Sequence, residues 1–156
     1  MRLTDPNVQG ASHRARQFST FYLENLFFGV DVLQVQEVMR YQPMTPVPRA
    51  PGVIEGLINL RGQIVTAIDM RRRLGLPSRP EGYAPIVVVV RTADGAVSLL
   101  VDEIGDVMEM DDSLYEPPPV SLAQSAREVI RGVYKLKDQL LLILDEERTV
   151  DVAALA

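Results

Sequence analysis

The stretch VIEGLINLRGQIVTAID, residues Val53–Asp69, is the main indication of the fold because a similar stretch occurs a second time in the sequence. The second copy, VIRGVYKLKDQLLLILD, occupies Val129–Asp145 and repeats the first glycine, so that Gly132 stands where Gly56 stood. Only the first copy carries Asn-Leu-Arg-Gly. A duplicated segment predicts two similar substructures, each too small to bury its own apolar faces alone.

The similarity extends upstream of both copies. Phe18–Asn25 aligns with Val87–Asp94, and Phe28–Met39 aligns with Val97–Met108. Chance likeness between β segments is the alternative explanation, but corresponding blocks in the same order argue against it. Proline-rich stretches, PMTPVPRAPG and EPPPVSLAQS, separate the blocks in each half. The boundary between the halves is expected near Pro80.

Strand-forming residues between turn signals predict hairpins in each half. The turns are expected at Glu24-Asn25, Arg61-Gly62, Asp94-Gly95 and Lys137-Asp138. Long helical periodicity is absent, and short helices are expected after Asp69 and after Ser121, which have the side chains of N-caps. The pattern therefore predicts a mainly β fold of two small barrels with short helices.

Several strands are apolar on both faces. In QLLLILDE, Leu142 and Leu144 point to one side, while Leu141 and Ile143 point to the other. A barrel in water needs only its inner face to be apolar. The outer apolar residues therefore either pack one barrel on the other or meet partner proteins.

Composition excludes several functions. The net charge is −5, which disfavours nucleic-acid binding, and there is no cysteine. The one histidine, His13, lies in a polar N-terminal segment, and no phosphate-binding glycine loop or metal-ligand set is present. Arg71–Arg73 is interpreted as a solvated helix face, with an acidic partner as the alternative, and the acidic segment Asp102–Asp112 as a solvated strand edge and turn. We expect Asp69 and Asp145 to cap turns, no cofactor, no metal and no enzyme activity.

Apolar runs such as PIVVVV and LLLIL are far shorter than the roughly 20 residues that cross a bilayer. The N-terminus has no apolar segment of the signal-peptide kind. The sequence therefore predicts a cytoplasmic protein without direct membrane insertion.

Three motifs carry a resemblance to a known family. The run GLINLRGQIVTAIDMRRRLG contributes Asn59, Leu60, Arg61 and Gly62; FFGVDVLQVQEVM contributes Val35, Glu37 and Val38; LLVDEIGDVMEM contributes Val101, Asp102, Ile104 and Val107. Together they resemble the CheW family, the adaptors of bacterial chemosensory arrays. The resemblance covers about residues 16–152.

The resemblance implies a fold of two SH3-like five-stranded β-barrels in pseudo-symmetric arrangement. The polar residues 1–15 are expected to be disordered, and the resemblance places a single domain at residues 16–152. Its first barrel is placed at roughly 18–80 and its second at roughly 84–150. In the family fold the chain can pass between barrels, so strand exchange is compatible with these bounds.

The resemblance also implies a function without an active site. Such proteins bind a chemoreceptor's cytoplasmic tip in a groove between the barrels, and bind the regulatory domain of a CheA-type histidine kinase. Val35 and Val38 are then candidate groove walls. Glu37 and Arg61 would orient the partner, with an internal Glu37–Arg61 pair as the alternative. Asn59 is a further candidate contact, although a bond to nearby backbone is favoured.

Other candidate roles are structural. Gly62 supplies the turn, and Gly56 and Gly132 are expected to answer a backbone need, either a positive φ or a close approach. The expected location is beside membrane-bound receptor arrays. A second hypothesis is a self-assembling module whose sheet edges join copies of itself, or of similar chains, into rings or filaments.

Overall fold

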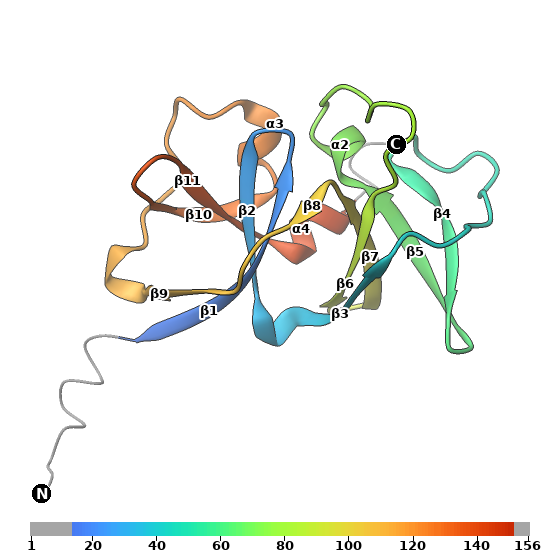
Figure 1. Cartoon of the computed structure of the whole chain (residues 1–156), viewed down its shortest axis with the longest axis horizontal. Helices are drawn as coiled ribbons and strands as arrows, with labels where there is room; N and C mark the ends of the chain where they lie inside the picture. The colour runs from blue at the N-terminus through green and yellow to red at the C-terminus, as the bar shows by residue number, and fades with distance from the viewer. Residues whose placement is uncertain (1–13, 152–156) are drawn as a thin grey trace, which may run out of the picture.

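The computed structural model describes residues 14–151, which form two sheets lying side by side (Figure 1). One, the β1 sheet, contains β1 (Ala15–Leu23), β2 (Leu26–Asp31), β8 (Glu103–Ile104), β9 (Met108–Asp111), β10 (Ile130–Lys135) and β11 (Leu140–Leu144). The other, the β5 sheet, contains β3 (Val35–Arg40), β4 (Ile54–Leu60), β5 (Gln63–Asp69), β6 (Ile86–Thr92) and β7 (Gly95–Val101). The expected mainly β fold is confirmed. The β1 sheet counts six strands because β8 and β9 are two pieces of one edge, both paired with β1.

A single bridge brings the two ends of each sheet together. The β5 sheet runs β3-β6-β7-β5-β4, and Thr45, shortly after β3, bridges Leu57 of β4. In the β1 sheet, Glu116, shortly after β9, bridges Val133 of β10. Each sheet therefore curls toward a closed barrel, in which few edge groups are left exposed.

The duplication read from the sequence recurs in the pairing. The parallel pair Thr66↔Val97 joins β5 to β7, and the parallel pair Leu142↔Phe28, at the equivalent repeat positions, joins β11 to β2. The β4–β5 and β10–β11 ladders also shift register at equivalent places, just before Gly56 and Gly132. The two repeats therefore build the same pairings, irregularities included.

The halves 18–80 and 84–150 do not each form one sheet. Strands β6 and β7 of the second half join β3, β4 and β5, while β8 to β11 join β1 and β2. The physical reason is that the parallel pairs above join strands from different halves, so each sheet needs both. At the N-terminus, Ala15 already begins β1, and residues 1–13, with His13, lie outside the described part.

Apolar residues on both faces of the strands fill three separate cores. Val88 and Leu99 meet Phe28 and Leu142 in a core between the sheets. Val87 and Val89 point instead into the β5 sheet's own barrel, and Leu141 and Ile143 point into the other. This alternation confirms that most outward apolar residues pack barrel on barrel.

The helices are short, as expected: α2 (Met70–Arg73), α3 (Gln124–Arg127), α4 (Glu146–Val150), and the 3-10 turns η1 (Val32–Gln34) and η2 (Asp112–Leu114). Asp69 caps α2 by accepting a hydrogen bond from Arg71 N, and Asp145 caps α4 by accepting one from Arg148 N. The capping prediction is thereby confirmed for both aspartates. The expectation for Ser121 is wrong, because α3 begins after Ala123, which makes no side-chain cap.

The hydroxyl of Ser98, on β7, is fully buried and has no hydrogen-bond partner among residues 14–151. A buried unpaired hydroxyl destabilises a fold. We expect Ser98→Ala to raise the free energy of unfolding by about 1 kcal/mol, measured by urea denaturation. The exposed Ser113→Ala serves as a control and should leave it unchanged. A loss of stability in Ser98→Ala would mean that the hydroxyl is hydrogen-bonded in solution.

Candidate protein-docking groove

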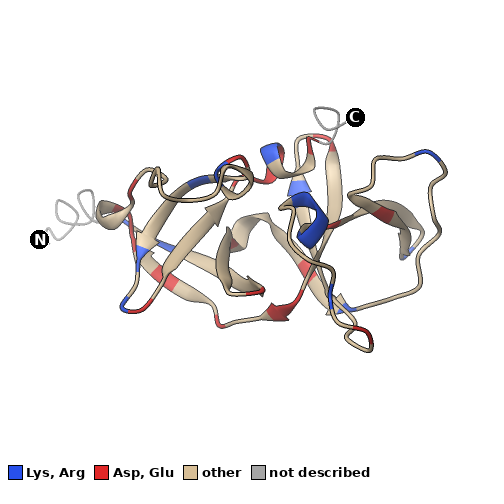
Figure 2. Ribbon diagram, turned by 90° about the horizontal axis from the view of Figure 1, so that it is seen from above, with Lys and Arg blue, Asp and Glu red and all other residues tan. Residues whose placement is uncertain are grey.

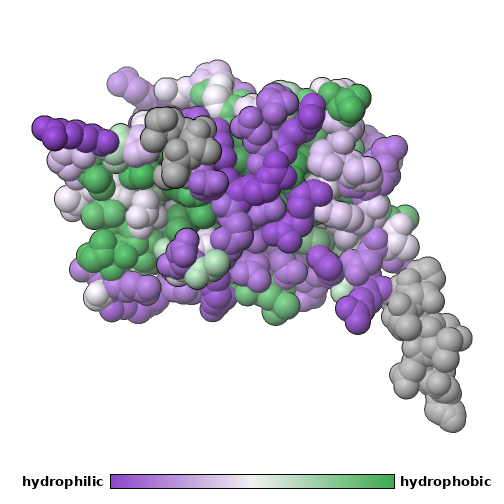
Figure 3. All heavy atoms as spheres, turned by 180° about the vertical axis from the view of Figure 1, so that it is seen from behind, coloured by the Kyte–Doolittle hydropathy of each residue, from purple (hydrophilic) through white to green (hydrophobic). Residues whose placement is uncertain are grey.

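An apolar hollow of about 170 Å³ lies where the two sheets meet. We call it the inter-sheet groove and define it by its lining: Ser19, Thr20, Phe21, Val30, Val38, Val88, Ile104, Gly105 and Val107. Three of these apolar side chains remain exposed: Val38 (45%), Ile104 (43%) and Val107 (59%). Elsewhere at the junction, seen from behind, hydrophilic residues cover the middle of the molecule (Figure 3).

Strand β3 forms one wall of the groove and is irregular. Val35 pairs with Val90 and Glu37 pairs with Val89, so Gln36 is an extra residue in the ladder. Such a bulge changes which face the following side chains point to. It leaves Val35 and Val38 on the same side, facing the core between the sheets. Val38 lines the groove, whereas Val35 is half-buried against the core and supports the wall.

Glu37 and Arg61 lie away from that wall and form an ion pair. Glu37 shares a strand face with Met39, which packs into the β5 sheet's barrel. Arg61 Nη1 and Nη2 donate to Glu37 at 2.6 and 3.0 Å. The hydrogen bond from Arg61 lowers the pKa of Glu37, and the same bond raises the pKa of Arg61. The internal pair weighed as an alternative is therefore present, while 76% of the Arg61 side chain stays exposed.

The Asn-Leu-Arg-Gly run makes the β4–β5 turn. Arg61 and Gly62 both have positive φ, 53° and 88°, which glycine tolerates best. Asn59 Oδ1 accepts a hydrogen bond from Gly62 N at 2.8 Å, confirming the local backbone bond expected for Asn59. The turn therefore holds Arg61 beside Glu37 and separates both from the groove-lining face of Val38.

The two repeated glycines stand at close approaches of neighbouring segments rather than at a positive φ. A side-chain Cβ at Gly56 would lie 2.7 Å from the carbonyl oxygen of Thr45. A Cβ at Gly132 would overlap the ring of Tyr115. Both contacts come from the segments that close the barrels, so these glycines let the closing segments cross the β4 and β10 strands.

The prediction of a solvated arginine run is wrong for two of its three members. Arg71 and Arg73 are buried, and only Arg72 is half-exposed. Arg73 donates to the carbonyl oxygens of Thr149 and Arg148 at the end of α4. The basic residues of α2 lie beside the junction between the sheets (Figure 2). Arg71 and Arg73 are held there by contacts with the second repeat, which a local helix pattern does not reveal.

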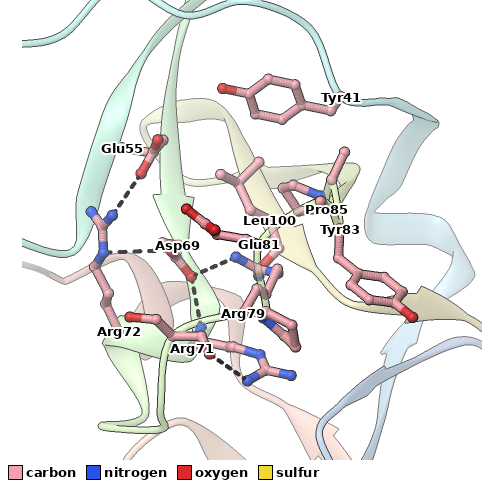
Figure 4. Close-up of a pocket in the computed structure, with 14 residues that line it drawn as sticks. Tyr41, Glu55, Asp69, Arg71, Arg72, Arg79, Glu81, Tyr83, Pro85 and Leu100 are labelled. Carbon is pink, nitrogen blue, oxygen red and sulfur yellow. Dashed lines mark hydrogen bonds and ion pairs between the residues drawn. The ribbon is translucent and has the colours of Figure 1, made fainter.

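Arg71 belongs to a charged cluster centred on Asp102, which the sequence treated as part of a solvated edge. Arg71 Nη2 and Arg79 Nε reach Asp102 at 2.7 and 3.0 Å. Arg79 also reaches Asp69, as Figure 4 shows. Glu24 N donates to Asp102 as well. Burial raises the pKa of Asp102, but the bonds from Arg71 and Glu24 outweigh it and hold the pKa below its ordinary value.

This charged cluster borders a cavity of about 540 Å³ with Tyr41 and Tyr83 on its rim (Figure 4). Every guanidinium nitrogen of Arg71 and Arg79 already has an acceptor within the chain. The bonds of these two arginines therefore join separate chain segments at the edge of the cavity. Across residues 14–151, no group of three His, Cys, Asp or Glu is placed to hold a metal.

Comparison with known proteins settles the family. The family model described as CheW-like domain matches residues 17–154. The chain belongs to the CheW family. This CheW-family chain is 30% identical over 131 residues to the chemotaxis protein CheW of Bacillus subtilis, covering 84% of each. It is 29% identical over 141 residues to that of Klebsiella aerogenes, covering 90% of this chain and 85% of the relative.

A solved structure agrees with this assignment. The crystal structure of the scaffolding protein TtCheW from Thermoanaerobacter tengcongensis matches with a TM-score of 0.76 at 29% identity, covering 83% of this chain and 88% of that one. The chain is thus a member of a chemotaxis scaffold family rather than of an enzyme family. None of its helices within residues 14–151 has the length and apolar character to span a bilayer.

The structure brings together groove residues that the sequence did not assign to the site. Ile104 and Val107 stood in the third motif but were given no binding role. Both line the groove with Val38. The sequence did contain a signal for them: the alignment of the two repeats places Ile104 at the position of Val35 and Val107 at the position of Val38.

Proposed function

We propose that the chain couples a chemoreceptor to a CheA-type sensor histidine kinase, with the receptor's cytoplasmic tip docking in the inter-sheet groove. The exposed apolar side chains of Val38, Ile104 and Val107 carry this proposal. An apolar groove suits the apolar face of a helical hairpin. The kinase's regulatory domain is the second partner. A chain with this role acts in the cytoplasm beside membrane-bound receptor arrays.

The Glu37–Arg61 pair is proposed as a second, polar contact for the receptor, outside the groove itself. Glu37 is next to Val38 on β3 but faces the other side of the strand, and Arg61, in the β4–β5 turn, is largely exposed. A planar guanidinium already held by Glu37 has lost much of its rotamer freedom, so less entropy is lost when a partner's carboxylate or carbonyl approaches. Charged contacts of this kind set orientation more than affinity.

The groove is tested by placing a charge in it. Val38→Asp should weaken binding of a fragment carrying a chemoreceptor's cytoplasmic tip by at least about tenfold, because a carboxylate would be desolvated there. Titration calorimetry with the receptor fragment measures this. Val120→Asp, at an 89% exposed valine outside the groove, is the control and should bind as wild type. Unchanged binding in a folded Val38→Asp would refute the groove as the receptor site.

The role of Arg61 is tested by reversing charges. Arg61→Glu should weaken receptor binding several-fold to tenfold, because Glu37 then faces a like charge and the partner loses its cation. The double variant Glu37→Arg, Arg61→Glu restores an internal pair with the signs exchanged. If Arg61 contacts the receptor, the double variant stays weak. Recovery to wild-type affinity would show that the pair only fixes the turn.

A further inference from the structure

The second wall of the groove is a bend between β8 and β9 that is bound to β1. Ile104 pairs with Phe21, and Met108 pairs with Phe18. Between these two pairs, the wall has three residues (105–107), whereas β1 has only two (19 and 20). The wall contains a bulge, and a bulge re-aims the side chains that follow it. Ile104 and Val107 consequently both line the groove, although they are three positions apart.

The two walls are equivalent in the repeat. The alignment that matches Val35 with Ile104 also matches Val38 with Val107 and the extra residue Gln36 with Gly105. Both walls therefore present apolar residues three positions apart, through a bulge at the same repeat position. The groove is built by two related bulged strands facing each other.

One of these bulges is locked by a side chain. Thr20, on β1, is 1% exposed, and its Oγ1 donates to the carbonyl oxygen of Asp106 at 2.6 Å. Gly105 N donates to Thr20 O at 2.9 Å. The hydroxyl thus satisfies a carbonyl that the bulge removes from the ladder. At the equivalent position of the other wall's neighbouring strand stands Val89, which has no hydroxyl to offer.

Gly105 is the matching half of this lock. A Cβ at position 105 would lie 2.5 Å from Thr20 Oγ1 and 3.3 Å from Phe27 Cε1. A side chain at 105 and the hydroxyl at 20 therefore exclude one another. The close approach that lets Thr20 reach Asp106 requires glycine in the bend.

We infer that Thr20 and Gly105 form a positioning pair that holds Ile104 and Val107 in the groove and thereby sets its affinity for the receptor tip. This rests on the proposed function. Thr20 is buried and acts through the wall rather than by contact with the partner. A preset wall loses less conformational entropy on binding than a mobile one.

The hydroxyl is tested by Thr20→Val, which keeps the shape and removes the donor. Affinity for the receptor-tip fragment should fall about three- to tenfold, the equivalent of one hydrogen bond. Thr20→Ser keeps the donor and should stay within about twofold of wild type. Affinity for the kinase's regulatory domain should be unchanged in both. Wild-type receptor affinity in Thr20→Val, or an equal loss of kinase binding, would overturn the inference.

Hydrogen exchange separates this inference from the proposed function. In Thr20→Val, the backbone amides of residues 106–108 should exchange at least about fivefold faster, while those of β10 and β11 keep their rates. If the wild-type chain binds no receptor fragment, the proposed function fails, and the exchange rates alone then decide whether the lock exists. Unchanged exchange at residues 106–108 would refute the lock.

The dependence of Thr20 and Gly105 on each other is tested by adding a methyl group at position 105 with and without the Thr20 side chain. Gly105→Ala should weaken receptor binding because the new methyl group meets Thr20 Oγ1. In a Thr20→Ala background the same change should have a smaller effect, because the methyl group then has room. Equal effects of Gly105→Ala in both backgrounds would show that the two residues act independently, contrary to the inference.

Discussion

Replacing Arg71 by methionine is expected to lower the free energy of unfolding by about 3–5 kcal/mol, the usual result of removing one member of a buried ion pair. The Arg71 side chain is only 11% exposed, and its Nη2 donates to Asp102 at 2.7 Å. Asp102 lies on the connection from β7 to β8, where the chain passes between the sheets, and accepts from Glu24 N in the β1–β2 turn. Loss of Arg71 therefore loosens a link between the two sheets.

The adjacent arginine is a matched control. Arg72 is half-exposed and pairs with Glu55 at 3.1 Å. Arg72→Met should change the free energy of unfolding by less than about 1 kcal/mol, as exposed ion pairs contribute little. Urea denaturation of both variants measures the difference. Similar losses in the two variants would contradict the assignment of a buried structural cluster.

The same cluster gives the stability a defined pH dependence. The pKa of Asp102 is depressed in the folded state, so its contribution is fully present above the ordinary value of 3.8 and is lost as the pH falls through the lower folded pKa. Glu146 acts in the opposite direction, because burial raises its pKa and the folded state binds its proton more tightly. An Asp102→Asn variant should therefore lose less stability than wild type on acidification below pH 3.8.

Local features were predictable because they depend on neighbours in the chain. The Arg61-Gly62 turn, the caps of Asp69 and Asp145 and the bond of Asn59 each join residues no more than three positions apart. The duplication was predictable because the pattern of apolar residues in both copies must fill equivalent cores.

Contacts between the repeats were not predictable from local patterns. Which strands share a sheet depends on the parallel pairs between halves. The equivalent strands of the two repeats are similarly apolar, so the hydropathy pattern does not distinguish which of them pairs with a given strand. Burial of Arg71 depends on Asp102, 31 positions away, and only the place of Asp102 in the third motif hinted at it. The groove residues Ile104 and Val107 are brought to one side by a bulge, which breaks the alternation on which strand analysis rests.

The second large effect concerns the two repeated glycines, for which the structure predicts unequal results. Gly56→Ala should lower the free energy of unfolding by about 2–3 kcal/mol, in the range of overpacked cores. The new Cβ would meet the backbone oxygen of Thr45 at 2.7 Å. Thr45 exchanges two backbone hydrogen bonds with Leu57, at 2.9 and 2.8 Å, so it cannot retreat without opening the barrel.

Gly132→Ala should have the smaller effect, within about 1 kcal/mol, although its Cβ overlaps its neighbour more. The obstacle is the end of the Tyr115 side chain, which is 39% exposed and can rotate outward. The rotation gives up an edge contact with Tyr134, whose ring centroid lies 5.4 Å away. In a Tyr115→Ala background, Gly132→Ala should then be neutral or slightly stabilising, since alanine lowers the entropy of the unfolded chain. Urea denaturation of Gly56→Ala, Gly132→Ala, Tyr115→Ala and the double variant of positions 132 and 115 measures these free energies of unfolding. A larger loss for Gly132→Ala than for Gly56→Ala would show that the Tyr115 ring is held as firmly as the backbone.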